Sequence, residues 1–180
     1  MEFRGPYVIV APFSLVPKWI QDFQKWLPSL PIACLDVAAE ERGEMYSEQL
    51  NPVNRRQLDF PVIIVSYEVA IIDREFLNRI GEFTHVIIDE GGLEEYRNTL
   101  ISSMKGITSV NHLLLGSAPL KRDLQELATM LNFVNTCLFD MLEWIGNIKR
   151  AINEEKEQQV VSHLHDALMP FVLRRDKNQE

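Results

Sequence analysis

The chain has 180 residues, of which 46% are hydrophobic, and this is enough apolar sequence for one sizeable core. Its 26 acidic residues outnumber its 18 basic residues, and the net charge of -8 argues against tight nucleic-acid binding through phosphate neutralisation alone. No apolar run approaches the roughly 18 residues of a membrane span, and Cys34 and Cys137 lack the CxxC spacing of a metal or redox site. We therefore expect a soluble intracellular protein with no membrane partner.

The first half of the chain alternates short apolar runs with amphipathic segments. A run rich in Val and Ile at 7–11 predicts a strand, and a helical repeat that Pro28 ends follows at Val16, Trp19, Ile20, Phe23 and Trp26. We assign the aromatic members of this repeat to the core rather than to a stacking platform for bases. Runs at 32–35 and 62–66 predict two more strands.

The second half continues the alternation. A helix is predicted over 68–80, ending at Gly81, and strands over 85–89 and 112–115 precede a helix over 120–134. From 140 the pattern is helical up to Pro170. Because the strand runs are continuously apolar, they are typical of a parallel sheet buried on both faces, and the predicted class is α/β.

One predicted strand ends in two carboxylates, Asp89 and Glu90, which Gly91 and Gly92 follow. A buried strand that delivers Asp-Glu to its tip is how nucleotide-hydrolysing domains present a magnesium ligand beside a water-activating carboxylate. The alternative is a carboxylate pair that caps the next helix. The phosphate loop GxxxxGK[ST], which a nucleotide site also requires, does not occur in the 180 residues.

Five segments in the same order resemble the first RecA-like lobe of the Swi/Snf-type chromatin-remodelling ATPases, which are helicase-like proteins. Residues 5–12 with Ser14 and Trp19 resemble motif Ia, and residues 65–68 resemble the Ser/Thr-Tyr/Phe-Glu motif. Residues 89–91 resemble motif II, 113–133 resemble motif III with its trailing helix, and 165–175 resemble the segment that closes the lobe. Residues 71–74 and 155–158 look most similar to the lymphoid-specific helicase branch.

This resemblance implies a RecA-like parallel sheet flanked by helices, without the phosphate-loop strand and with a helical C-terminal segment. It places an incomplete ATP-binding lobe at 1–139 and a helical extension at 140–180. It implies ATP and Mg²⁺ as cofactors, with Asp89 and Glu90 as the catalytic pair of a degenerate motif II and Asp89 as the Mg²⁺ ligand of a complete site. Motif III is formed by Gly116, Ser117, Ala118 and Pro119, and contacts to DNA are implied for Ser14, Lys18, Ser66, Tyr67, Arg174 and Arg175.

Alternatives remain for the implied DNA contacts. Ser14 suits a capping position at the start of a helix as well as it suits a DNA contact. Arg174 and Arg175 suit a solvated basic end of a helix. A turn is the simplest role for Gly91 and Gly92.

The departures from the family pattern are as informative as the matches. Gly92 stands where a histidine is expected, and the acidic run 93–96 replaces a basic one. In motif III, Gly-Ser-Ala-Pro at 116–119 replaces Thr-Gly-Thr-Pro. We expect the phosphate loop, and the second lobe that carries the arginine finger, to lie outside these residues.

Two functions follow as hypotheses. The first is a partial ATPase lobe of a nuclear, DNA-translocating chromatin remodeller that acts on nucleosomes and is inactive in isolation. The second is a degenerate pseudo-ATPase domain that binds DNA, chromatin or a protein partner without turnover. In either case the implied partners are DNA or the nucleosome, together with the missing upstream segment and second lobe or a protein partner.

Overall fold

The computed structural model describes residues 6–50, 62–90, 97–116, 124–135, 146, 166 and 168–173. The chain divides into two compact units, Met1–Lys121 and Arg122–Glu180, each of which is described separately. The elements of the first unit are β1 Tyr7–Ala11, the 3-10 turn Phe13–Leu15, α1 Val16–Trp26, β2 Ile32–Cys34, α2 Ala39–Glu44, the π-helical turn Met45–Gln49, β3 Val62–Ser66, α3 Tyr67–Ile72, α4 Arg74–Ile80, β4 Phe83–Asp89, α5 Arg97–Met104 and β5 Ser109–Leu115. The second unit contains α6 Leu124–Val134.

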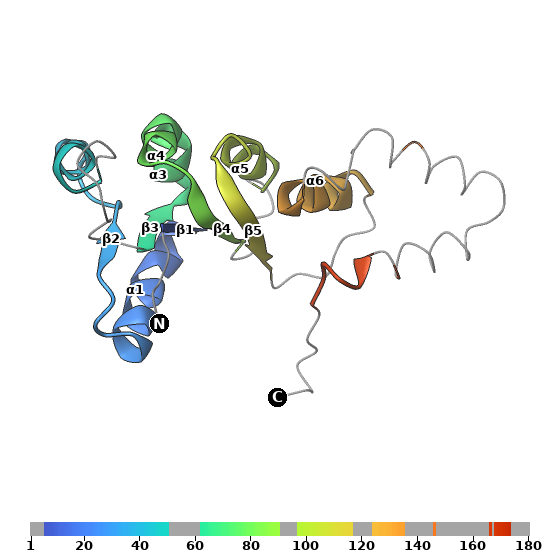
Figure 1. The fold of residues 1–180 in the computed structure, drawn as a ribbon, viewed down its shortest axis with the longest axis horizontal. Helices are drawn as coiled ribbons and strands as arrows, with labels where there is room; N and C mark the ends of the chain where they lie inside the picture. Colours follow the sequence, from blue (N-terminus) through green and yellow to red (C-terminus); the bar gives the residue numbers. More distant parts are fainter. Residues whose placement is uncertain are drawn as a thin grey trace. The chain divides into compact units, whose positions relative to one another are not determined.

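A five-stranded sheet in the order β2-β3-β1-β4-β5 forms the centre of the first unit (Figure 1). Every pairing is parallel. All five residues of β3 are buried, as are four of the five residues of β1, because both strands have neighbours on each side and helices over both faces. The predicted α/β class and parallel sheet are therefore confirmed.

Helix α1 covers one face of the sheet, whereas α3, α4 and α5 lie on the other (Figure 1). The core under α1 contains Ile9, Val16, Val62 and Ile64, and Trp19, Ile20 and Phe23 of the helix pack against it. The assignment of Trp26 to the core is wrong, since its side chain is 72% exposed. Phe23 is the last residue of α1 that packs on this core, and Lys25 Nζ lies 5.0 Å from the centre of the Trp26 ring.

The helix predicted over 68–80 is in fact two helices, α3 and α4, which meet at Asp73. The Asp73 carboxylate accepts hydrogen bonds from Arg42 Nε at 2.7 Å and from the Tyr46 hydroxyl at 3.3 Å. These bonds fix Asp73 in a non-helical conformation and attach α2 with its π-helical turn to the α3–α4 junction. The predicted end at Gly81 is confirmed, and its φ of 112° is one that glycine adopts without strain.

In the second unit, α6 begins at Leu124, and residues 120–123 of the predicted helix lie outside the described residues. Of its described side chains, those of Ala128, Leu131 and Phe133 are buried. In the region predicted to be helical from 140 to Pro170, residues 146, 166 and 168 are helical, whereas 169 and 170 already form a turn. The boundary at 139/140 stays a prediction. No described helix is long and apolar enough to cross a membrane.

β5 is an edge of the sheet, and in the described part of the chain no strand pairs with its outer side. Val110 and Leu113 on this strand are 64% and 43% exposed. A seven-residue edge strand with exposed apolar side chains is a template for pairing with a further segment. Among the described residues, β5 therefore has an unpaired edge, which we call the open β5 edge.

The Arg42–Asp73 ion pair provides the first prediction. Its side chains are only 14% and 10% exposed, so removing one partner leaves the other charge nearly buried. The Asp73→Ala variant should lose about 3 kcal/mol of unfolding free energy, measured by denaturant titration. The exposed Glu44→Ala control on α2 should change it by less than about 0.5 kcal/mol. Equal stability of Asp73→Ala and the control would contradict the assigned role of the pair.

Candidate functional site

The candidate site lies at the carboxyl end of β4, where Asp89 is the last strand residue. Asp89 is in register with Leu115 of β5, and the Glu90 N–H donates to the Leu115 carbonyl at 2.8 Å. This bond extends the β4–β5 pairing by one residue. The main chain of Asp89 and Glu90 is therefore fixed relative to the end of β5. The carboxyl edge of a parallel sheet is also where ligands of α/β proteins bind.

Two aromatic side chains hold Asp89. The Trp19 indole N–H, from α1, donates to Asp89 Oδ2 at 2.9 Å. The Tyr67 hydroxyl, from the first residue of α3, donates to the Asp89 carbonyl oxygen. The helical repeat assigned Trp19 to the core and the resemblance placed it in motif Ia, but neither predicted its bond to Asp89. The ring nitrogen of Trp19 could have indicated such a bond, because the N–H of a largely buried tryptophan normally has a hydrogen-bond acceptor.

Glu90 is 6% exposed and lies against Gly116, the first residue after β5. A Cβ atom built on Gly116 would be 2.8 Å from Glu90 Oε2 and 3.5 Å from its Cδ. The hydrogen atom of glycine is therefore what allows the carboxylate to occupy this position. The structure brings together Asp89, Glu90 and Gly116, the described residues of motifs II and III.

The four described residues with an implied DNA contact fall into two pairs. Ser14 and Lys18 are exposed at the start of α1, where neither the 3-10 turn nor α1 has a side-chain cap, so the capping alternative for Ser14 is wrong. Ser66 and Tyr67 are only 2% and 3% exposed. Their polar groups form hydrogen bonds within the protein: Ser66 bonds to Asp36 and Val69, and Tyr67 bonds to Asp89.

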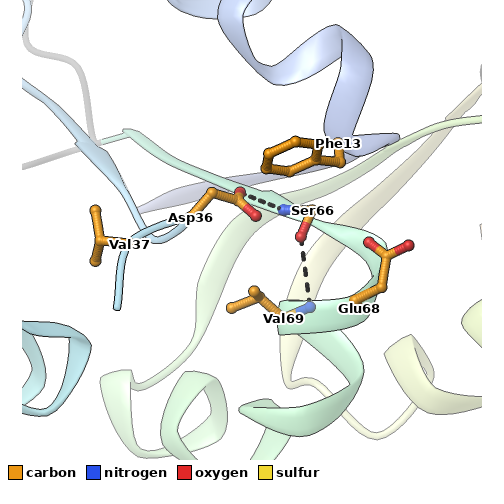
Figure 2. A pocket seen from close by; sticks show the side chains of 6 residues that line it. All are labelled: Phe13, Asp36, Val37, Ser66, Glu68 and Val69. Atoms are coloured by element: carbon orange, nitrogen blue, oxygen red, sulfur yellow. Dashed lines mark hydrogen bonds between the residues drawn. The ribbon is translucent and has the colours of Figure 1, made fainter. Parts of the chain in front are cut away.

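Figure 2 shows how Ser66 is used. Its N–H donates to Asp36 Oδ2 at 2.7 Å, and its Oγ accepts from the Val69 N–H at 3.5 Å as the cap of α3. These residues line an open pocket of about 440 Å³, which Phe13, Val37 and Glu68 complete. Two carboxylates in its wall make the pocket a poor phosphate site.

The remaining site residues lie outside the described part of the chain. They are Gly91, Gly92, Ser117, Ala118, Pro119, Arg174 and Arg175.

The donor set at the strand end fits Mg²⁺. Among the described residues no group of three or more His, Cys, Asp or Glu side chains could hold a metal by itself. Mg²⁺, however, is commonly held by one or two carboxylates together with substrate phosphates and waters. Asp89, with one carboxylate oxygen fixed by Trp19, is suited to that role.

The sequence also matches the model of a known protein family. The profile of the SNF2-related domain matches residues 1–179. The chain belongs to this family. The resemblance drawn from the motifs is thus confirmed.

Several relatives in the SNF2-related family are much longer than this chain. It is 32% identical to the ISWI chromatin-remodeling complex ATPase ISW1 of Saccharomyces cerevisiae, with 98% of the chain and 15% of the relative covered. It is 33% identical to the ATP-dependent DNA helicase DDM1 of Arabidopsis thaliana, over 96% of the chain and 24% of that relative. It is 32% identical to the human lymphoid-specific helicase, over 97% of the chain and 22% of that relative. The chain spans less than a quarter of the length of each of these relatives.

A solved structure supports the fold. The Sulfolobus solfataricus SWI2/SNF2 ATPase core in complex with dsDNA matches with a TM-score of 0.73 at 21% identity, over 98% of this chain and 36% of that chain. The sheet and helices of the chain therefore have the RecA-like architecture of that core.

The contact between Gly116 and Glu90 provides the second prediction. A methyl group at 116 must displace the buried carboxylate, so Gly116→Ala should cost about 1–3 kcal/mol of unfolding free energy. Gly43→Ala on α2 is the matched control, because nothing lies within 4 Å of the added Cβ. It should instead stabilise the protein by about 0.5–1 kcal/mol. A Gly116→Ala variant as stable as Gly43→Ala would show that Glu90 does not depend on the glycine for its position.

Proposed function

We propose that this chain is part of the first ATPase lobe of a DNA-translocating chromatin remodeller, and that it is inactive in isolation. The observation that carries the proposal is the placement of Asp89 and Glu90 at the carboxyl end of a central strand, against Gly116, within an SNF2-related domain. Relatives named as chromatin-remodelling ATPases and DNA helicases support the substrate class and a nuclear location.

The roles of the two carboxylates follow from their surroundings. Asp89 would hold Mg²⁺, with Trp19 and Tyr67 fixing its side chain and main chain. Glu90 would orient the attacking water, and its position depends on Gly116. Mg²⁺, when bound, neutralises developing charge on the β- and γ-phosphates of ATP. Phosphate-loop contacts and an arginine finger must come from elsewhere in the protein.

DNA would contact the exposed start of α1. Ser14 and Lys18 lie there, and Arg174 and Arg175 are further proposed contacts. Such contacts to phosphates carry no sequence information. Since the net charge is -8, binding by the chain alone should be weak. The open β5 edge supports an additional partner, either a further segment of the same protein or another protein.

The second candidate is a pseudo-ATPase domain that binds DNA, chromatin or a protein without turnover. Two observations favour it. Gly92 and the acidic run 93–96 replace the expected histidine and basic residues. In addition, the pocket beside Ser66, where the resemblance implies contacts to DNA phosphates, presents the carboxylates of Asp36 and Glu68, which favours a protein partner over DNA at that place.

ATP hydrolysis tests the proposal. The isolated chain should show no DNA-stimulated phosphate release above background, because the loss of an arginine finger alone lowers the rate by about 10³ to 10⁵. The control is an Asp89→Asn, Glu90→Gln double variant, which should give the same background. Turnover by the chain that this double variant abolishes would contradict the proposed inactivity.

DNA binding tests the proposed surface. A Lys18→Ala variant should bind duplex DNA more weakly than the unmodified chain, and the slope of log K against log salt should fall by about 1. Lys25→Ala, at the other end of α1, is the matched control and should leave the slope unchanged. Fluorescence anisotropy across a salt titration measures both. Equal slopes for the two variants would exclude Lys18 from the DNA surface.

A further inference from the structure

The hydrogen bond from Trp19 to Asp89 connects residues 70 positions apart. The Trp19 ring packs against the core under α1 and lies 6.2 Å from the Phe23 ring, so the direction of its N–H is fixed by packing. The acceptor is Oδ2, an atom of the carboxylate itself. Rotation of the Asp89 carboxylate is therefore controlled by a residue of a different element.

Tyr67 controls the same residue from a second element. Its side chain is 3% exposed, and its hydroxyl donates to the Asp89 carbonyl oxygen. The main chain and the side chain of Asp89 are thus held by two aromatic residues, from α3 and α1. Neither aromatic residue belongs to the strand that carries the carboxylate.

We propose that Trp19 is a positioning residue that orients the Asp89 carboxylate for a divalent cation and couples α1 to it. The proposal rests on the role of Asp89 in the proposed function. Carboxylates that bind metals are usually oriented by hydrogen bonds from neighbouring groups, and loss of such a partner typically weakens metal binding about 10- to 100-fold. Lys18, the preceding residue, is exposed on the same turn of α1, so a phosphate bound there would act on the helix that holds Asp89.

Nuclear magnetic resonance of the 180-residue chain tests the hydrogen bond. The spectrum should contain three indole N–H signals, one for each tryptophan, and Trp19→Phe identifies the signal of Trp19. In Asp89→Ala this signal should shift upfield and exchange faster with solvent. Asp22→Ala, an exposed carboxylate on the same helix, is the matched control and should leave it unchanged. A Trp19 signal that does not respond to Asp89→Ala overturns the proposal.

Binding of Mn²⁺ tests the positioning role. Because Asp89 would hold the ion together with ATP phosphates and waters, binding is measured with ATP present and with residues 6–173 of the chain grafted in place of the matching segment of the yeast ISWI ATPase, from the electron paramagnetic resonance of the bound ion. Trp19→Phe should weaken Mn²⁺ binding at least about tenfold with little change in secondary structure, whereas the exposed Trp26→Phe should not. If Asp89→Asn weakens binding and Trp19→Phe does not, the positioning role is overturned and the metal-ligand role of Asp89 stands. If Asp89→Asn has no effect, the metal-ligand role fails and the proposal falls with it.

Discussion

The parallel register between β4 and β5 is the constraint on which the candidate site depends. It sets Asp89 opposite Leu115, so the next residues on the two strands, Glu90 and Gly116, meet beyond the end of the ladder. A slip of one residue would reverse the side-chain directions along a strand and separate the carboxylate from the glycine. Val86 and Ile88, which are buried residues of β4 itself, oppose such a slip because it would move their side chains out of the core.

Two helices further fix the position of Asp89. α1 and α3 lie on opposite faces of the sheet (Figure 1). Each contributes one aromatic side chain that donates a hydrogen bond to Asp89. Ser14 and Lys18, two of the DNA contacts of the proposed function, lie at the start of α1, the helix whose Trp19 donates to the carboxylate. Ser66 and Tyr67, which the resemblance associates with DNA, contribute to this arrangement from buried positions. Ser66 caps α3, and the Tyr67 hydroxyl donates to the main chain at the end of β4.

Much of the fold could be predicted because it depends on local sequence. The continuous apolar runs of β1 and β3, and the helical repeat of α1, gave the correct bounds. The starts of β4 and β5 were placed too late, since residues such as Thr84 and Asn111 interrupt the apolar pattern near the ends of the sheet. The break at Asp73 and the bond from Trp19 to Asp89 were missed. Each depends on a partner 31 or 70 residues away, which no local pattern reveals.

The central claim is that Asp89 and Glu90 form a competent half of an ATPase site. The most direct measurement grafts residues 6–173 of this chain in place of the matching segment of the yeast ISWI ATPase, which provides the rest of the protein. DNA-stimulated ATP hydrolysis by this chimera should exceed background and should be abolished by Glu90→Gln. A chimera that folds and binds DNA but does not hydrolyse ATP would contradict the claim and support the pseudo-ATPase alternative.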